Sequence, residues 1–314
     1  MQRVLITGGA GFIGTHLVER LCDDADLVVF DNFRRDSLAH APHLQAKRSV
    51  KIISGDVMMP ASLKDAVAGV DTVVHLAAVA GVSSYYNEPL NTLRTNILGT
   101  VNLLEECRQQ KIEHLVYFST SEVYGANALW VDESSVNQVG PVADLRWVYA
   151  TSKLAGETLC LRYSQQYGFA CTVVRPFNIY GPGQVGEGAI SNFCRAAVGH
   201  QPLTIYGDGS AIRAWCYISD LIDAVQTIVE KRPDCQLFNI GNPSEVETTC
   251  GLARRITNLF PGTSIRFQNT THCEIRARIP VIDRARNLLG FQPEVDLDEG
   301  LSRTLKWFKH YGQI

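Results

Sequence analysis

Residues 1–14 read MQRVLITGGAGFIG, and this stretch decides how the rest of the chain is expected to fold. Its residues 4–7, Val-Leu-Ile-Thr, form an aliphatic run bounded by glycine, which predicts a buried parallel strand. Gly8, Gly11 and Gly14 follow, and apolar residues at helical spacing come next. Glycines between a strand and a helix let the backbone approach a pyrophosphate closely, and the helix N-terminus attracts its negative charge. The stretch therefore predicts a dinucleotide-binding turn.

A second apolar run, at residues 27–30, ends at Asp31. In dinucleotide-binding folds, an acidic residue about 20 residues beyond the glycines hydrogen-bonds the adenosine ribose. Because a carboxylate at this place repels a 2′-phosphate, Asp31 favours NAD over NADP. Arg34 and Arg35 follow closely and leave three alternatives open: the opposite preference, a contact with the pyrophosphate, or simple exposure to solvent.

Strands and helices alternate through the first half of the chain. Residues 50–53, 72–76 and 114–118 predict strands, and residues 62–68 and 90–108 predict helices between them. This alternation is typical of a Rossmann-type α/β fold, a doubly wound parallel sheet with helices on both faces. Ligands of such sheets bind beyond the carboxyl ends of the strands.

The regular alternation weakens after residue 173. The stretch 175–183, Arg-Pro-Phe-Asn-Ile-Tyr-Gly-Pro-Gly, is too rich in proline and glycine for a long helix or a central strand. We therefore predict an NAD-binding Rossmann domain over residues 1–173. Residues 174–314 are predicted to form a smaller C-terminal α/β lobe that binds substrate and is interleaved with the sheet.

The overall composition is that of an ordinary globular protein. The chain has 314 residues, of which 46% are hydrophobic and 19% charged, with a formal net charge of −3. This charge gives no basic surface for nucleic acid or an anionic membrane, and no apolar run approaches the roughly 20 residues that cross a bilayer. The first strand begins at once, so we expect no signal peptide and a cytoplasmic location. The nine scattered cysteines, among them Cys273, form no CxxC pair and predict buried thiols rather than a metal site.

A set of reactive side chains follows the strand predicted at residues 114–118. Thr120, Ser121 and Glu122 come directly after it, at the expected mouth of the cofactor crevice. Tyr149 and Lys153 lie four residues apart, and therefore face the same side of a helix. An ammonium group near a phenol lowers the phenol pKa, which for free tyrosine is about 10, and so creates a general base that works near neutral pH. Thr120 is suited to hydrogen-bond the same substrate hydroxyl.

At these motifs the chain resembles the extended short-chain dehydrogenase/reductase family, in its nucleotide-sugar epimerase, dehydratase and decarboxylase branch. The resemblance covers essentially the whole chain. It implies a nucleotide-sugar substrate, with a UDP-sugar favoured, that NAD oxidises at C4 to a 4-keto intermediate. The NAD-binding residues that this pattern predicts are Gly8, Gly11, Phe12, Ile13, Gly14, Asp31, Asn32, Asp56, Val57, Leu76, Ala77, Ala78, Tyr149 and Lys153.

The resemblance also implies substrate contacts and an assembly. Asn178 and Arg213 match positions that hold the nucleotide diphosphate in relatives, and a guanidinium group presents a fork of donors to phosphate oxygens. Family members usually form homodimers through two helices, here around residues 90–108 and 149–167. A homodimer is therefore expected.

Residues 120–122, Thr-Ser-Glu, distinguish reactions within this branch. UDP-glucose-type 4-epimerases usually have no carboxylate there, and dTDP-glucose 4,6-dehydratases carry Asp-Glu in place of Ser121 and Glu122. GDP-mannose 4,6-dehydratases and UDP-glucuronate decarboxylases both show Thr-Ser-Glu. Arg278, in the sequence Arg-Ile-Pro, resembles a decarboxylase arginine that reaches the sugar carboxylate. Val281 departs from the decarboxylase pattern. Two other roles therefore stay open for Arg278: a contact with a substrate phosphate, or a salt bridge that packs the lobe.

The resemblance therefore favours a UDP-glucuronate (UDP-hexuronate) decarboxylase. A 4-epimerase of UDP-glucose or UDP-glucuronate is the nearest alternative, followed by an NDP-hexose 4,6-dehydratase. A non-catalytic dinucleotide sensor belongs to a different class, and sensors on this fold typically lack the tyrosine or the lysine. The presence of Tyr149 and Lys153 disfavours that class.

Overall fold

The computed structural model describes residues 2–269 and 275–311, so Cys273 lies outside the described part of the chain. The chain divides into two compact units. The first unit consists of Met1–Val123, Val139–Arg175 and Ile222–Phe238, and the second unit of Tyr124–Gln138, Pro176–Leu221 and Asn239–Ile314. Each unit is therefore built from separate stretches of sequence. The division into two domains at residue 173 stays a prediction.

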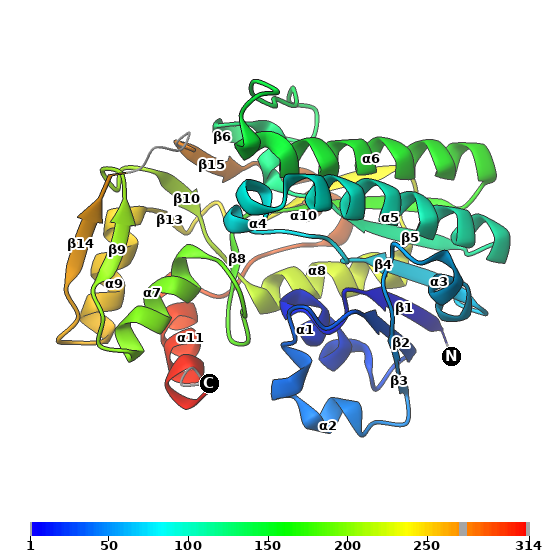
Figure 1. The fold of residues 1–314 in the computed structure, drawn as a ribbon, viewed down its shortest axis with the longest axis horizontal. Helices are drawn as coiled ribbons and strands as arrows, with labels where there is room; N and C mark the ends of the chain where they lie inside the picture. Colours follow the sequence, from blue (N-terminus) through cyan, green and yellow to red (C-terminus); the bar gives the residue numbers. More distant parts are fainter. Residues whose placement is uncertain (1, 270–274, 312–314) are drawn as a thin grey trace. The chain divides into compact units, whose positions relative to one another are not determined.

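A seven-stranded sheet forms the centre of the first unit (Figure 1). Its strands, in the order in which they neighbour one another, are β12 (Gln236–Ile240), β7 (Ala170–Pro176), β5 (His114–Phe118), β4 (Thr72–His75), β1 (Arg3–Thr7), β2 (Asp26–Asp31) and β3 (Val50–Ser54). From β7 to β3 every neighbouring pair is parallel. This sheet confirms the predicted Rossmann-type α/β fold, and it brings the carboxyl ends of β1, β2 and β4 to one edge.

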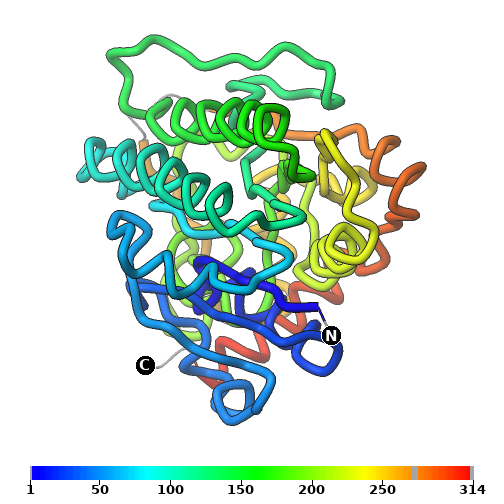
Figure 2. Tube along the Cα trace, turned by 90° about the vertical axis from the view of Figure 1, so that its right-hand side faces the viewer, coloured from blue at the N-terminus to red at the C-terminus, as the bar shows by residue number. Residues whose placement is uncertain are grey.

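Helices cover both faces of this sheet. The helices of the first unit are α1 (Phe12–Leu21), α2 (Pro42–Gln45), α3 (Pro60–Val67), α4 (Val82–Asn87), α5 (Pro89–Gln110) and α6 (Val148–Tyr167), and α8 (Ile218–Lys231) begins in the second unit and ends in the first. Three short 3₁₀ helices, η1 (Leu38–His40), η2 (Ser121–Tyr124) and η3 (Leu145–Trp147), lie between them. Helices α5 and α6 run side by side on one face, and α1 lies on the other (Figures 1 and 2).

Local sequence explains where the two long helices begin and end. Pro89 occupies the first turn of α5, where its missing N–H costs no intrahelical hydrogen bond. Gly168 ends α6 in the left-handed conformation, with φ of 79°, which glycine adopts without strain. Side chains such as Leu104 and Leu115 fill the core between helices and sheet, where both are fully buried.

The second unit is a smaller α/β assembly. Its strands are β6 (Asn127–Val131), β8 (Ile179–Tyr180), β9 (Leu203–Tyr206), β10 (Ile212–Ala214), β11 (Cys216–Tyr217), β13 (Val246–Thr248), β14 (Ile265–Gln268) and β15 (Ala277–Pro280). They form a four-stranded sheet, β13-β10-β15-β6, and two pairs, β11-β8 and β14-β9. Its helices are α7 (Ala189–Val198), α9 (Thr249–Leu259), α10 (Asp283–Leu289) and α11 (Leu297–Tyr311). Within the described residues, no helix is long and apolar enough to span a bilayer.

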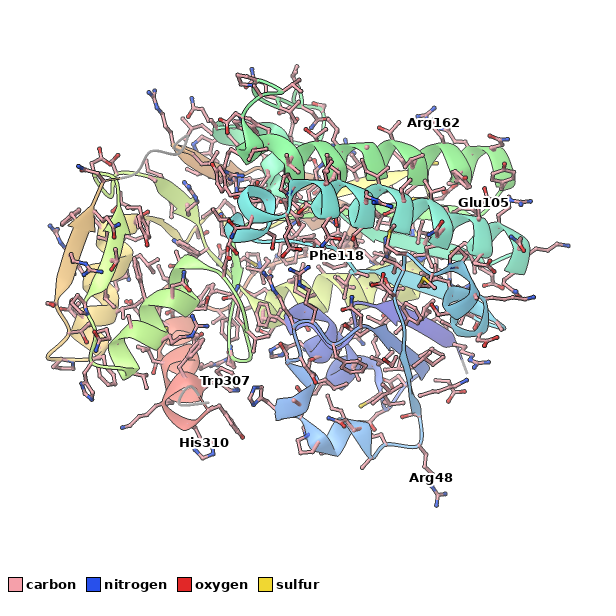
Figure 3. The ribbon with its side chains drawn as sticks, viewed as in Figure 1. Arg48, Glu105, Phe118, Arg162, Trp307 and His310 are labelled. Carbon is pink, nitrogen blue, oxygen red and sulfur yellow. The ribbon has the colours of Figure 1, made fainter. Side chains whose placement is uncertain are left out.

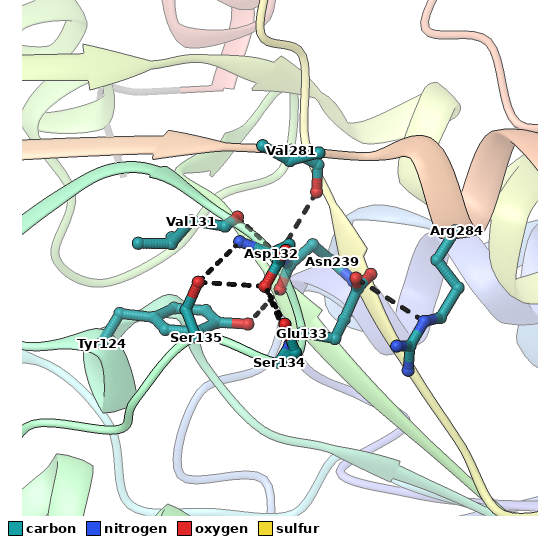
Figure 4. Close-up of polar contacts among 9 residues, drawn as sticks. All are labelled: Tyr124, Val131, Asp132, Glu133, Ser134, Ser135, Asn239, Val281 and Arg284. Atoms are coloured by element: carbon teal, nitrogen blue, oxygen red, sulfur yellow. Dashed lines mark hydrogen bonds and ion pairs between the residues drawn. The ribbon is translucent and has the colours of Figure 1, made fainter.

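A polar network around Asn239 holds the ends of β6 and β15 together in the second unit (Figure 4). The Asn239 amide donates to the carbonyl oxygens of Val131 and Val281 at 3.0 and 3.3 Å, and it accepts from the Tyr124 hydroxyl at 2.8 Å. The backbone N–H of Asn239 donates to the Glu133 carboxylate at 2.8 Å. Because Asn239 is fully buried and its donors and acceptor are satisfied, this network stabilises the strand on which the predicted substrate residue Arg278 lies.

Candidate active site

The glycine turn between β1 and α1 has the shape of a phosphate cradle. Gly8 has φ of 72°, and a Cβ atom there would lie 2.7 Å from the backbone nitrogen of Ala77. A Cβ on Gly14 would lie 2.5 Å from the carbonyl oxygen of Gly8, so both positions require glycine. Gly11 is different, because a Cβ there would meet only the Gly8 oxygen, at 3.2 Å. Gly11 is also the N-cap of α1 and carries no capping side chain, which leaves the first N–H groups of the helix available to an anion.

Asp31 braces this turn from the end of β2. One carboxylate oxygen accepts the N–H of Ala10 at 2.9 Å, and the other accepts the N–H of Phe33 at 2.8 Å. Burial raises the pKa of Asp31 above its ordinary value, while these two hydrogen bonds act in the opposite direction. Each oxygen keeps a second lone pair, so the carboxylate still has acceptor capacity for ribose hydroxyls.

Other predicted cofactor residues lie at the same edge of the sheet. The Asn32 amide donates to Asp56 at 3.3 Å, which joins the segments that follow β2 and β3. Leu76, Ala77 and Ala78 come directly after β4 and are half-buried. These residues and the glycine turn fit NAD in their chemistry: the free N–H groups at the start of α1 suit a pyrophosphate, and a carboxylate at the end of β2 suits a ribose.

Arg34 has a carboxylate partner of its own. Its guanidinium group pairs with Glu88 at 2.6 Å, and both side chains are exposed by more than two fifths. This ion pair satisfies Arg34 within the protein. The Arg34 side chain is therefore paired with Glu88, and the glycine turn is braced by the Asp31 carboxylate.

Lys153 ties helix α6 to the end of β5. Its ammonium group donates to the carbonyl oxygen of Phe118 at 2.7 Å and lies 5.0 Å from the centre of the Tyr117 ring. Lys153 is 3% exposed, and this burial lowers its pKa to about 8. Tyr149 is half-buried one helical turn earlier, where the Ser152 hydroxyl donates to its carbonyl oxygen at 2.7 Å. The predicted base and its lysine therefore share one face of α6, beside the strand that leads to Thr120.

The Thr-Ser-Glu segment leads into η2, with Thr120 and Ser121 buried and Glu122 half-buried. Thr120 is 8% exposed and Ser121 is 3% exposed. The Thr120 hydroxyl oxygen accepts the backbone N–H of Glu122 at 3.2 Å. The Glu122 carboxylate forms an ion pair with Arg146 at 2.5 Å. The sequence analysis gave Arg146 no role, because its partner Glu122 lies 24 residues away in sequence.

Asn96 is a second residue that the sequence analysis missed. Its side-chain amide donates to the carbonyl oxygen of Val79 at 3.1 Å and to the Ser152 hydroxyl at 2.9 Å, and its oxygen accepts the Val79 N–H at 2.8 Å. Asn96 lies on α5, so these bonds join α5, α6 and the segment after β4. It fixes the backbone of the segment after β4 against the helix that carries Tyr149.

The predicted substrate residues lie in the second unit. Asn178 donates to the carbonyl oxygen of Ala214 at 2.9 Å, and Arg213 donates to those of Ile212 and Ile275 at 2.8 and 2.9 Å. Arg213 on β10 is the register partner of Arg278 on the parallel strand β15, although 65 residues separate them in sequence. Side chains of register partners point to the same face of a sheet. The structure therefore brings two of the predicted substrate residues together.

A cavity of about 430 Å³ opens beside Arg213 in the second unit. Its lining combines the aromatic side chains of Phe193 and Tyr206 with the polar side chains of Asn192 and Thr249. This volume lies within the range of about 300–1,000 Å³ that is usual for small-molecule sites. Among the residues that the structure describes, no group of three or more His, Cys, Asp and Glu side chains is arranged to hold a metal ion.

Comparisons with known proteins agree with this arrangement. Residues 4–241 match the model of the NAD dependent epimerase/dehydratase family. The chain is 34% identical to UDP-glucuronic acid decarboxylase 1 of Xenopus tropicalis, over 98% of this chain and 72% of that protein. It is also 34% identical to UDP-N-acetyl-alpha-D-glucosaminuronate decarboxylase of Bacillus cytotoxicus, over 98% of both chains.

Solved structures show the same likeness in three dimensions. UDP-glucuronic acid 4-epimerase from Bacillus cereus, in complex with UDP-glucuronic acid and NAD, superposes with a TM-score of 0.91. It is 27% identical, and the match covers 99% of this chain and 100% of that one. UDP-glucose 4-epimerase from Thermotoga maritima, solved with UDP-glucose, is 26% identical with a TM-score of 0.89, over 99% of both chains.

Proposed function

This chain belongs to the NAD dependent epimerase/dehydratase family, and we propose that it is an enzyme that decarboxylates a UDP-hexuronate, with UDP-glucuronate as the substrate. The observation that carries the proposal is the similarity to decarboxylases over 98% of the chain, together with a Thr-Ser-Glu segment at the end of β5. Glu122 places a carboxylate beside the predicted tyrosine helix, and Arg278 adds a buried cation on β15.

Proton transfer at the sugar C4 hydroxyl is the first task of the protein. Tyr149 removes this proton, and the Thr120 hydroxyl hydrogen-bonds the same oxygen. Lys153 is still largely protonated at neutral pH, since its pKa is about 8, and its positive charge favours the phenolate form of Tyr149. When NAD is bound, it supplies the acceptor for the C4 hydride. The residues that would hold it are those of the glycine turn, with Asp31 and the segment after β4.

The 4-keto sugar then loses carbon dioxide. The bond between C5 and C6 breaks, its electron pair moves into C5 and the C4 carbonyl, and the C6 carboxylate leaves as carbon dioxide. A proton added at C5 completes this step. The protein therefore has to orient the C6 carboxylate and exclude water, and it needs no side chain to abstract a proton from carbon.

Charge in the second unit supports an anionic substrate. Arg213 and Arg278 are register partners in the four-stranded sheet, so two positively charged side chains share one face of it and raise the positive potential there. The adjacent cavity of about 430 Å³ provides aromatic side chains for a base and polar ones for a ribose. We assign the nucleotide to this cavity, with Asn178 and Arg213 near the diphosphate.

A 4-epimerase acting on UDP-glucuronate is the second candidate. The superposition with the Bacillus cereus UDP-glucuronic acid 4-epimerase, at a TM-score of 0.91, favours it. The two reactions share the oxidation at C4 and differ in the fate of the 4-keto sugar. In the epimerase, the C6 carboxylate stays on the sugar and the hydride returns to the opposite face.

We also propose a homodimer formed through the outer faces of α5 and α6. Leu90 and Leu98 of α5 are 72% and 45% exposed, so this helix offers apolar side chains to a second copy of the chain. Small-angle scattering would give twice the chain mass of 34.7 kDa, whereas a monomeric mass would overturn the dimer. A cytoplasmic location is proposed as well, since all eight described cysteines are free thiols.

Product analysis tests the proposed reaction. The purified protein is incubated with NAD and UDP-glucuronate that carries ¹³C at C6, and the products are followed by NMR. Release of the label as carbon dioxide, with a UDP-pentose or its 4-keto precursor, is the expected result. Formation of UDP-galacturonate that keeps its label would make the protein an epimerase. Recovery of unchanged UDP-glucuronate would contradict both reactions.

A further inference from the structure

The Glu122 carboxylate lies beside a buried cation. Its oxygen is 2.5 Å from a guanidinium nitrogen of Arg146, and the two side chains are 15% and 9% exposed. Both residues belong to the first unit, Glu122 in η2 and Arg146 in η3. An ion pair that is shielded from water in this way is stronger than a pair at the surface, and loss of one partner leaves the other charge buried.

Arg146 is held in place by contacts within the first unit. Its backbone N–H donates to the Asp144 carboxylate at 2.9 Å, which caps η3. Its guanidinium group lies 5.2 Å from the centre of the Tyr85 ring and 5.9 Å from that of Trp147. Trp147 in turn packs against Gly140, where an added Cβ would lie 2.0 Å from the indole nitrogen. The guanidinium group is therefore fixed between two aromatic rings, with one edge toward Glu122.

The titratable groups that act on Arg146 come from two elements. Glu122 acts on Arg146 from η2, and Tyr85 and Tyr86 act on it from α4. Burial lowers the pKa of Arg146, but the charge and hydrogen bond of Glu122, together with Tyr85 and Tyr86, hold this pKa above its ordinary value. Arg146 is therefore a cation at neutral pH, and its charge faces the Glu122 carboxylate.

We propose that Arg146 is a positioning residue that fixes the Glu122 carboxylate and presents it to the substrate as an anion, never as an acid. The proposal rests on the proposed function for the place of Glu122 at the reacting end of the sugar. It deepens that function by separating two fates of the 4-keto sugar. Loss of the C6 hydroxyl as water moves a proton from C5 to the departing oxygen, and a carboxylate whose charge is held by a buried arginine is a weak base and a poor carrier for that proton. Decarboxylation needs no such proton, because C6 leaves as carbon dioxide from an ionised carboxylate.

Carboxyl NMR tests the charge state without substrate. Protein labelled with ¹³C at glutamate carboxyl carbons is titrated with acid, and the Glu122 signal is assigned by its loss in Glu122→Gln. In the unmodified chain, the midpoint should lie below the ordinary value of about 4.3. Arg146→Gln should raise it by roughly 1–3 pH units, the usual effect of a nearby opposite charge. A midpoint at or above about 4.3 in the unmodified chain would overturn the proposal, as would equal midpoints with and without Arg146.

Two further variants separate this role from a general effect on folding. Arg162→Gln removes an exposed cation from the outer side of α6 and should leave the Glu122 midpoint unchanged (Figure 3). Arg146→Lys keeps the charge but not the planar fork, so its midpoint should stay near that of the unmodified chain while kcat falls. If Arg146→Gln does not fold, Arg146→Lys replaces it in the test. A Glu122 midpoint in Arg146→Lys that rises to the value of free glutamate would contradict the role of the positive charge.

Kinetics connect the pair to the reaction. The acid limb of kcat/KM should move upward in Arg146→Gln by the same shift as the NMR midpoint, whereas lost packing alone would lower the rate at every pH. An unchanged acid limb would overturn the proposal. A low NMR midpoint in a protein that leaves UDP-glucuronate unchanged would instead reject the proposed function, so the two failures are distinguishable.

Discussion

At the scale of single residues, the hydroxyl of Tyr149 is the group on which the proposed chemistry depends. Tyr149→Phe removes the proton acceptor and should lower kcat by about 10²–10⁴-fold, the usual contribution of a general base. NAD affinity, measured by fluorescence titration, should change little. Tyr163→Phe is the matched control, because Tyr163 lies on the same helix and its hydroxyl bonds Glu105 at 2.6 Å. A kcat that survives in Tyr149→Phe would assign the proton transfer to another group.

Asp31 carries the preference between the two nicotinamide cofactors. Asp31→Asn keeps the shape of the side chain but removes the charge that opposes a 2′-phosphate. The ratio of NADP to NAD affinity should therefore rise by about tenfold or more, since one charge pair at contact distance is worth ~1–4 kcal/mol near a protein surface. Isothermal titration calorimetry with both cofactors gives this ratio. Asp65→Asn, which removes an exposed carboxylate from α3, should leave the ratio unchanged, and an unchanged ratio in Asp31→Asn would refute the assignment.

Residues that act through their neighbours in sequence were predictable, and residues that act across the fold were not. Gly8 and Lys153 are recognised because their partners lie in a short motif or one helical turn away. Arg146 pairs with Glu122 across 24 residues, a contact that only the packing of η3 against η2 creates. Asn96 was missed for the same reason, because its amide reaches Ser152 across 56 residues.

At the scale of secondary-structure elements, a buried ion pair joins α6 to β7. Arg175 contacts Glu157 at 2.8 and 2.6 Å, and the side chains are 2% and 4% exposed. The Ser119 hydroxyl also donates to Glu157, next to Thr120. Glu157 lies one turn after Lys153 on α6. The ion pair therefore fixes the position of this part of the helix relative to β7.

Breaking this pair should cost far more than replacing it. Arg175→Met leaves the Glu157 charge buried without its counterion and should lower the free energy of unfolding by about 3–5 kcal/mol. The double variant Arg175→Met with Glu157→Leu should recover much of that loss, because no buried charge remains. Urea denaturation measures both. Equal losses in the single and double variants would show that the pair acts through its packing alone.

Elements differ in how far their own sequence predicts them. The long helix α5 and the strands of the large sheet follow from periodic apolar residues, and the observed bounds differ from the expected ones by only a few residues. The short strands β10 and β15 have no such signal, because three or four residues show no period. Their pairing, which joins Arg213 to Arg278, depends on the fold around them.

At the scale of the whole molecule, two buried histidines couple stability to pH. His75 contacts the hydroxyls of Thr7 and Thr100 at 2.7 and 3.1 Å, and burial lowers its pKa to about 3. His114 contacts the Thr172 hydroxyl at 2.9 Å, and burial lowers its pKa to about 4. Both rings are therefore neutral in the folded chain at any pH where the protein is expected to work.

The sign of the pH effect follows from proton binding. An unfolded histidine has a pKa of about 6.5, so below that pH the unfolded chain binds protons that the folded chain excludes. Stability from these two groups is present above pH 6.5 and is lost as the pH falls toward 4, at about 1.4 kcal/mol per pH unit for each histidine. His114→Gln removes one of the two histidines. It should therefore remove about half of their joint contribution to the slope of unfolding free energy against pH. His310→Gln, which changes an exposed ring on α11, should leave the slope unchanged (Figure 3). Urea denaturation between pH 7 and pH 5 measures the slopes, and equal slopes in all three proteins would mean that His114 gains its proton without unfolding.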